Sequence, residues 1–156
     1  MKVIVVTGTP CTGKTTIAKV LAKKLKWKYL DVNKIIKKYK LIESYDKLRK
    51  TNEVSIKKLN KALLKEIKSN SIIDSHLSHY LPKKSVTLCI VLKCSLKDLK
   101  KRLIKRKYPE IKIKENLEAE AFETSLVESS KHKNVLVFDT SKESKTSILK
   151  IILKHI

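Results

Sequence analysis

Hydrophobic and polar residues follow two patterns along this chain, and the patterns alternate. Five short runs are apolar, wholly or nearly so: residues 3–6, 29–32, 71–74, 86–92 and 135–138. Continuous apolar runs of this length, rich in β-branched residues, are typical of strands that are buried on both faces of a parallel sheet. The chain is therefore expected to contain five such strands.

Between these runs, apolar residues recur every three or four positions, which predicts amphipathic helices with one buried face. The expected helices cover residues 14–26, 33–40, 56–67, 96–103, 117–127 and 148–152. Residues 41–52 are polar and suggest irregular structure, and Pro109 is expected to interrupt the charged segment 105–114. Strands that alternate with helices predict a three-layer, doubly wound α/β fold, with a five-stranded parallel sheet and helices on both faces.

Length and composition limit the possible classes of protein. A chain of 156 residues fits one domain, residues 1–156, and 42% hydrophobic residues are enough for a packed core. No apolar run approaches the roughly 18–20 residues of a membrane span, and the N-terminus lacks a signal-peptide core. We therefore expect a cytoplasmic protein that acts as a monomer. The three cysteines fit a reducing compartment, and Cys89 and Cys94 should face opposite sides of a strand.

A phosphate-binding motif follows the first predicted strand. Residues 8–16 read Gly-Thr-Pro-Cys-Thr-Gly-Lys-Thr-Thr, which matches G-x-x-x-x-G-K-[ST] between a buried strand and an amphipathic helix. Gly8 and Gly13 are the only glycines in the chain. Glycine permits the backbone angles by which a loop turns its N–H groups inward around an anion. A P-loop is therefore expected, and a plain strand–helix turn is the alternative.

The motif assigns a task to several of its residues. Lys14 is expected to reach the β- and γ-phosphates of ATP, Thr15 to bind Mg²⁺, and Thr16 to bond the α-phosphate. The two glycines and Cys11 supply backbone around the phosphates, and the N-terminus of the following helix adds its partial positive charge. Phosphoryl transfer depends mainly on such positioning and charge neutralisation, so the loop points to a phosphotransferase.

Two residues after the third predicted strand are further candidates. Asp74 ends that strand, where a carboxylate is the expected second partner of Mg²⁺, largely through water. The alternative for Asp74 is a cap or turn residue. His76 can orient water or a phosphate, although a lone histidine is more often structural.

Arginine is rare in this lysine-rich chain. Two of the three arginines, Arg102 and Arg106, lie four residues apart on one predicted helical face that leads into residues 105–114. Their planar guanidinium groups suit a lid that closes over phosphates and brings both side chains to the transferring group. A helix-surface ion pair is the alternative. The third, Arg49, has ordinary neighbours.

The net charge is strongly positive: 37 Lys and Arg oppose 15 Asp and Glu, a formal charge of +22. One interpretation is an anionic partner such as nucleic acid, a ribonucleoprotein or a nucleotide. The other is a chain that uses lysine as its default surface residue, as in many thermophile proteins. The basic residues are spread along the whole chain, which slightly favours the second interpretation.

Taken together, the motifs resemble the isoform-six type of adenylate kinase, over nearly the whole chain. Four stretches carry the resemblance: residues 8–16, Asp74-x-His76, Arg106-x-Tyr108, and Glu-Asn-Leu-x-x-Glu at 115–120. The resemblance implies a nucleoside monophosphate kinase fold with an acceptor-binding insertion at about 31–54 and a lid at about 105–115. It also implies a functional His76 and a lid residue, Arg106, that contacts ATP.

The same resemblance implies an activity and a partner. The expected reaction is phosphoryl transfer from ATP to AMP, with weaker ATP hydrolysis. The family also takes part in late maturation of the small ribosomal subunit, where it transiently binds a platform ribosomal protein near rRNA. An assembly ATPase with incidental kinase activity is therefore one alternative. A different small-molecule P-loop kinase, of the shikimate or cytidylate type, is another.

Several residues keep two interpretations. The family usually has glycine at Cys11, and often at Lys107, so Cys11 is expected in a strained backbone conformation as a space-filling or a reactive thiol. Asp31 and Asn33 either bind the acceptor nucleotide or cap the next helix. His79 is either a substrate contact or, as we expect, a surface residue.

Overall fold

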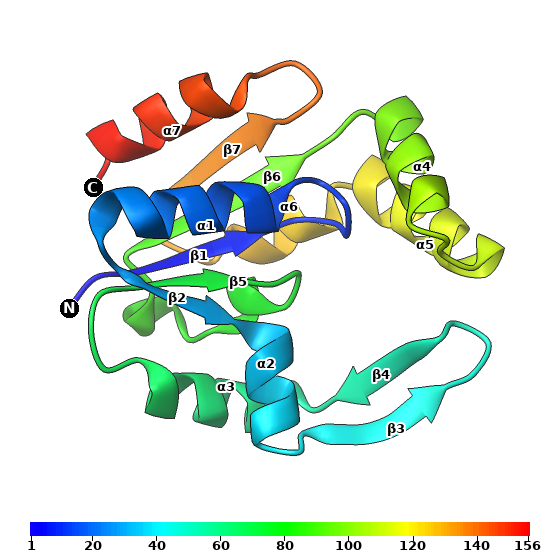
Figure 1. Ribbon diagram of the computed structural model, residues 1–156, viewed down its shortest axis with the longest axis horizontal. Helices are drawn as coiled ribbons and strands as arrows, with labels where there is room; N and C mark the ends of the chain where they lie inside the picture. The colour runs from blue at the N-terminus through cyan, green and yellow to red at the C-terminus, as the bar shows by residue number, and fades with distance from the viewer.

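A five-stranded parallel sheet forms the centre of the computed structural model, which describes residues 1–156 (Figure 1). The strand order is β2-β5-β1-β6-β7, and every neighbouring pair is parallel. The strands are β1 (Val3–Thr7), β2 (Lys28–Asp31), β5 (Ser71–Asp74), β6 (Leu88–Lys93) and β7 (Val135–Asp139). Each begins and ends within two residues of its predicted run, so the predicted sheet is confirmed.

Seven α-helices connect or flank the strands. They are α1 (Lys14–Leu25), α2 (Val32–Lys38), α3 (Ile56–Glu66), α4 (Leu96–Lys105), α5 (Glu110–Ala121), α6 (Thr124–Ser129) and α7 (Lys145–Lys154). Short 3₁₀ helices cover Ser78–Tyr80 (η1) and Lys83–Ser85 (η2). Ser55, Ser95 and Ser144 each accept a backbone N–H at a helix start, which is why α3, α4 and α7 begin where they do.

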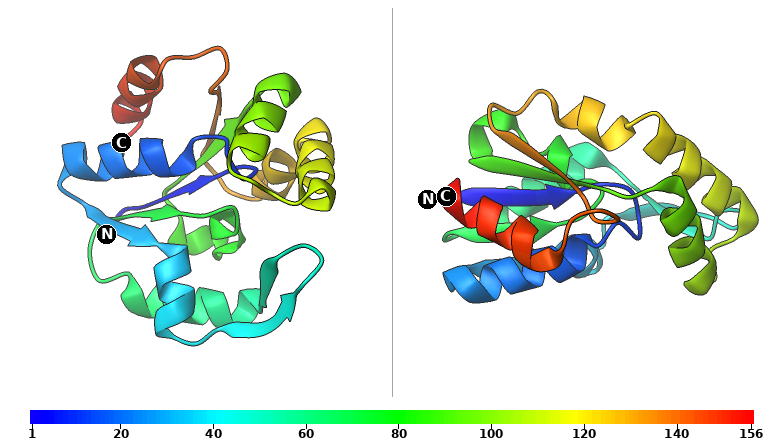
Figure 2. Two further views of the ribbon diagram at one scale, coloured as in Figure 1. Left: turned by 45° about the vertical axis from the view of Figure 1, so that its right-hand side comes forward. Right: turned by 90° about the horizontal axis from the view of Figure 1, so that it is seen from above.

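Helices cover both faces of the sheet, as the right-hand view of Figure 2 shows, and a hydrophobic core lies on each face. Side chains of a strand alternate between faces, so Ile4 and Val6 join the core beneath α1 and α7. Val3 and Val5 join the opposite core, with residues of α2, α3 and α6. Burial on both faces explains why the strands are apolar without alternation.

The segment that was expected to be irregular forms a β-hairpin instead. Strands β3 (Ile42–Asp46) and β4 (Thr51–Val54) pair antiparallel with each other and with no other strand. Most of their side chains are exposed, so burial imposes no alternation of polar and apolar residues on the hairpin. The prediction of irregular structure at 41–52 was wrong for this reason.

The hairpin and the α4–α5 pair both lie beyond the carboxyl ends of the parallel strands (Figure 1). Helix α4 ends at Lys105, Lys107 takes a left-handed conformation with φ 57°, and α5 begins directly after Pro109. The predicted break at Pro109 is thus confirmed. The predicted helix 117–127 is divided between α5 and α6 by Glu123, which has φ 52°.

Two further observations bear on the composition. The three cysteines are buried and free of disulfide bonds. None of the helices has the length and apolar character needed to cross a membrane.

Candidate functional site

The backbone of the loop between β1 and α1 depends on its two glycines. Gly8 has φ 132°, and a Cβ atom there would lie 2.2 Å from the carbonyl oxygen of Leu92. Gly13 has φ 99° and stands at the N-terminus of α1. A side chain at Gly8 would collide with β6, and at either position it would strain the backbone.

Cys11 has the left-handed backbone angle that the sequence led us to expect, φ 72°. This conformation costs a residue with a side chain roughly 1 kcal/mol or more. The Cys11 side chain is buried, and it belongs to a small core with Cys94, Leu99 and Leu103. That core packs α4 against the loop, so a space-filling role for Cys11 has a structural basis.

Lys14 folds back onto its own loop. Its ammonium donates a hydrogen bond to the carbonyl oxygen of Thr9 at 2.8 Å. Withdrawal from water lowers the pKa of Lys14 to about 8, while the carboxylates of Asp74 and Glu120 oppose this shift. The cation is therefore next to the loop and within the field of two carboxylates.

A hollow of about 330 Å³ opens at the carboxyl ends of β1, β2 and β5, and most of its lining residues are polar. Its lining residues are Pro10, Cys11, Lys14, Thr15, Asp31, Asn33, Thr51, Asp74, Ser75, His76, Arg106, Tyr108, Lys112 and Asn116. Eight of the candidates from the sequence thus meet in one place: Cys11, Lys14, Thr15, Asp31, Asn33, Asp74, His76 and Arg106.

Asp74 lies at the floor of this hollow. It is 8% exposed, and one of its carboxylate oxygens accepts a hydrogen bond from the Tyr29 hydroxyl at 2.8 Å. Burial, and then the bond to Asp74, raise the pKa of the Tyr29 phenol. The Tyr29 hydroxyl and the Asp74 carboxylate therefore meet at the end of β5, and Thr15 lines the same hollow as Asp74.

His76 is exposed to the hollow. Enclosure by the hollow, and then the positive charges of Lys14 and Lys112, lower the pKa of the imidazole, so His76 is neutral at pH 7. A neutral imidazole can accept or donate a hydrogen bond without adding to the positive charge of the site.

The two arginines of the predicted lid serve different places. Arg106 lines the main hollow with Lys14 and Asp74. Arg102 instead donates hydrogen bonds to the carbonyl oxygen of Cys11 at 3.3 Å and to the Thr140 hydroxyl at 3.2 Å. It lines a second, smaller hollow with Gly13, Thr16 and Thr140. Contacts with the loop thus hold Arg102 on its other side, away from the hollow of Arg106. That both guanidinium groups reach the transferring group when a lid closes stays a prediction.

The structure is compatible with both interpretations of Asp31 and Asn33, helix capping and acceptor binding. A carboxylate oxygen of Asp31 accepts the backbone N–H of Asn33 at 2.9 Å and so caps α2. Both side chains also line the main hollow, across from the loop.

His79 is a correction to the sequence analysis, because it is buried and not on the surface. It is 1% exposed. Its Nδ1 lies 2.7 Å from the Thr7 hydroxyl, and its Nε2 lies 2.9 Å from a carboxylate oxygen of Glu128. An Nε2–H that donates to Glu128 leaves Nδ1 as the acceptor for Thr7, the last residue of β1. His79 thus supports the strand that leads into the loop.

Sequence reasoning missed several residues of the site. Tyr29 and Thr51 had no motif, and Glu120, although part of a motif, had no role. Arg49 bonds Glu115 across the hairpin and α5, at 2.6 Å. The bonds Tyr29–Asp74, Thr9–Glu120 and Arg49–Glu115 join positions far apart in the chain. A single sequence carries no signal for such pairs.

The fold and the site together define a P-loop protein of the small-kinase type. A family model described as "AAA domain" matches residues 4–123. A shikimate kinase from Acinetobacter baumannii, solved with shikimate, has a similar fold: the TM-score is 0.64 at 18% identity, over 99% of this chain and 92% of that one.

Curated relatives give the family. The chain is 36% identical to a protein of Methanocaldococcus jannaschii named "Putative adenylate kinase", over 98% of this chain and 85% of that protein. It is 39% identical to the adenylate kinase isoenzyme 6 homologue FAP7 of Saccharomyces cerevisiae, over 75% of this chain and 60% of that protein. The chain belongs to the family of these archaeal putative adenylate kinases, and its similarity to the isoenzyme 6 homologue bears out the resemblance inferred from the motifs.

Proposed function

We propose that this protein transfers the γ-phosphoryl group of ATP to AMP, forming two molecules of ADP, and hydrolyses ATP slowly when no acceptor is bound. One observation carries the proposal. The main hollow is lined by two groups of residues. Lys14, Thr15 and Arg106 suit the phosphates of ATP. Asp31, Asn33 and Thr51 belong to the predicted acceptor-binding insertion at about 31–54. A donor and an acceptor nucleotide can then meet between the loop and the hairpin.

In this proposal, positioning and charge do most of the catalytic work. The loop N–H groups and the Lys14 ammonium bind the phosphates, and Arg106 neutralises charge on the transferring group. An acceptor phosphate is already an anion, so no general base is required. His76 can hold a water molecule or a phosphate oxygen by a hydrogen bond. Arg102 and Thr16 lie at the second hollow, where they can hold the rest of ATP.

The residues at the end of β5 suit Mg²⁺, which prefers oxygen ligands and usually keeps several waters. The Thr15 hydroxyl and the Asp74 carboxylate supply such oxygens, both residues line the main hollow, and Tyr29 bonds Asp74. Thr15 would hold the ion directly and Asp74 largely through water. Bound there, Mg²⁺ would neutralise charge on the phosphates of ATP.

A coupled assay of ADP formation tests the kinase proposal. Purified protein receives ATP with AMP, CMP, shikimate or no acceptor, and Lys14→Ala serves as the inactive control. We expect ADP formation to depend on AMP. Equal rates with and without AMP would overturn the proposal and favour an ATPase, whereas a rate that depends on shikimate would identify another kinase.

We further propose that the protein acts in the cytoplasm in late maturation of the small ribosomal subunit, bound transiently to a platform ribosomal protein near rRNA. The similarity to the isoenzyme 6 homologue of yeast, the role that the motif resemblance implies and the net charge of +22 support this proposal. Co-sedimentation with small subunits over a salt series, with and without ATP, tests it. Binding no stronger than that of Lys14→Ala under any condition would contradict nucleotide-dependent association.

A further inference from the structure

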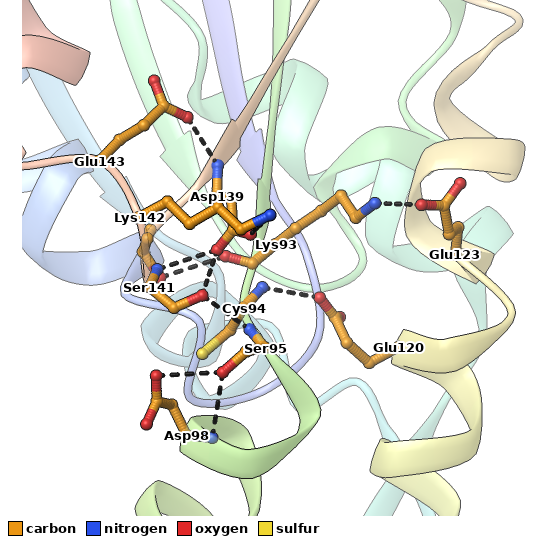
Figure 3. A network of polar contacts seen from close by, with 11 residues as sticks. Lys93, Cys94, Ser95, Asp98, Glu120, Glu123, Asp139, Ser141, Lys142 and Glu143 are labelled. Carbon is orange, nitrogen blue, oxygen red and sulfur yellow. Dashed lines mark hydrogen bonds and ion pairs between the residues drawn. The ribbon is translucent and has the colours of Figure 1, made fainter.

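A buried carboxylate, Glu120, contacts the phosphate loop from outside. Glu120 belongs to α5 and is 8% exposed. One of its oxygens accepts a hydrogen bond from the Thr9 hydroxyl. The other accepts the backbone N–H of Cys94 at 2.8 Å, directly after β6 (Figure 3). Glu120 thus joins α5 to two segments that lie 111 and 26 residues away in the chain.

The position of this carboxylate is unfavourable for an anion site. A buried carboxylate is costly unless its oxygens are hydrogen-bonded or paired with a cation. Glu120 forms no ion pair, unlike its neighbour Glu123, which bonds Lys93 (Figure 3). Its negative charge would also repel phosphates in the loop. A contribution other than its field at the Lys14 ammonium must therefore help to explain a carboxylate at this point.

That contribution is the shape of the loop, because Thr9 is the residue on which the loop closes. The carbonyl oxygen of Thr9 accepts hydrogen bonds from the Thr12 hydroxyl and the Lys14 ammonium, both at 2.8 Å. The Thr12 N–H also points to this oxygen, at 3.3 Å. Whatever fixes Thr9 therefore fixes the curvature of the loop from Gly8 to Lys14.

The helix that carries Glu120 also reaches over the main hollow. Lys112 and Asn116 line that hollow, and they precede Glu120 by eight and four residues. Positions four apart lie on one face of a helix, so a single face of α5 contacts both the hollow and the loop. A displacement of α5 would reach Thr9 through Glu120.

We propose that Glu120 is a positioning residue for the phosphate loop. It holds Thr9 in the conformation that turns the loop N–H groups toward a nucleotide's phosphates, and it ties that conformation to the placement of α5 over the hollow. The inference rests on the proposed function only in that the loop binds a nucleoside triphosphate.

The test compares three variants of the full chain. Glu120→Ala removes both contacts. Glu120→Gln keeps the shape but removes the charge: its amide oxygen can accept the N–H of Cys94, and its NH2 group can donate to the Thr9 hydroxyl oxygen. Glu118→Ala removes an exposed carboxylate from the same helix and serves as the matched control. The dissociation constants of ATP and AMP are measured by calorimetry, with KM and kcat for both and the melting temperature of each variant.

We expect Glu120→Ala to raise the Kd and KM for ATP about tenfold, with the KM for AMP and kcat changed less than threefold. The lost hydrogen bonds to a charged group account for an effect of this order. Glu120→Gln should bind ATP within about threefold of the wild type. Equal ATP affinity in Glu120→Ala and Glu118→Ala would overturn the inference, as would a parallel loss of ATP and AMP affinity.

A second pair of variants approaches the same bond from the loop. Thr9→Val removes the hydroxyl but keeps the size of the side chain, so it tests the contact even if Glu120→Ala does not fold. Thr9→Val should weaken ATP binding, and the double variant with Glu120→Ala should weaken it by less than the sum of the two separate effects. Additive effects would contradict the inference. Failure of the wild type itself to bind ATP would instead overturn the proposed function.

Discussion

The phosphate loop and the β3–β4 hairpin both contribute to the main hollow, but different forces hold them in place. The loop is fixed by backbone geometry and buried hydrogen bonds: Gly8 lies against Leu92, and Thr9 against Glu120. The hairpin has mostly exposed side chains. Arg49 pairs with Asp46 within the hairpin and with Glu115 of α5, and both ion pairs are partly open to water.

This difference indicates which side of the site is held more firmly. Buried contacts with one allowed geometry keep their strength in salt, whereas exposed ion pairs contribute about 0–1 kcal/mol and are screened. The side of the site that holds the loop is therefore built to remain fixed. The hairpin side is held by weaker contacts, which suits the proposed role of admitting an acceptor.

Gly8→Ala should have the largest effect of any change considered. The new Cβ would lie 2.2 Å from the carbonyl oxygen of Leu92, so the loop or β6 would have to shift. We expect a loss of about 3 kcal/mol or more in the free energy of unfolding, together with loss of ATP binding. Urea unfolding measures the first and calorimetry the second.

Gly13→Ala is the matched control for this change. A Cβ at Gly13 meets nothing closer than the Thr140 methyl group at 3.8 Å, so only backbone strain remains there. If the two variants were equally stable, the close contact with β6 would not be what fixes the loop.

His79→Gln should have the next largest effect, and the effect should depend on pH. The variant keeps a donor for Glu128 but leaves the Thr7 hydroxyl without a partner, which costs about 1–3 kcal/mol at pH 7.5. Burial lowers the pKa of His79, although Glu128 opposes the shift. Below about pH 6.5 the unfolded chain then binds more protons than the folded one, so acid reduces the stability of the wild type more than that of the variant.

Urea unfolding at several values between pH 7.5 and 5.5 measures this difference, with His155→Gln as an exposed control. The advantage of the wild type over His79→Gln should shrink as the pH falls. An advantage that stays constant, or one that His155→Gln also shows, would remove His79 from the support of the loop.

Glu115→Gln should affect the hairpin and little else. It weakens the ion pair with Arg49, so the free energy of unfolding should fall by less than about 1 kcal/mol. The hairpin itself should open more often, and trypsin should cut several times faster at the turn that contains Lys47, Arg49 and Lys50. Glu110→Gln, at an exposed position of α5 without an ion pair, is the control.

Salt gives an independent check on the hairpin. At 0.5 M NaCl the wild type and Glu115→Gln should be cut at similar rates, because the ion pair is screened. A difference that persists in high salt would mean that the hairpin is held by something other than this pair.

The same contrast explains what could be predicted from the sequence. The parallel strands were predictable because burial on both faces makes each run apolar, and the loop because its spacing is nearly unique. The hairpin was missed because its exposed side chains leave no pattern. His79 was misplaced, and Glu120 given no role, because their partners Thr7, Glu128 and Thr9 lie far away in the chain. Long-range polar pairs leave no periodic trace in one sequence.

Lys50→Gly should have the smallest effect on the free energy of unfolding. It should stabilise the protein, whereas the matching change in the loop should not. Lys50 in the hairpin turn and Cys11 in the loop both have left-handed backbone angles, φ 47° and 72°. Lys50 is exposed, so glycine there should relieve strain and stabilise the protein by about 0.5 kcal/mol. Cys11→Gly relieves similar strain but empties a place in a buried core, so it should give no gain. Lys47→Gly is the control, because Lys47 lies in the same turn without a left-handed backbone angle, and this change should destabilise the protein. Urea unfolding measures both variants. Equal changes in the free energy of unfolding at Lys47 and Lys50 would show that backbone strain is not the cause.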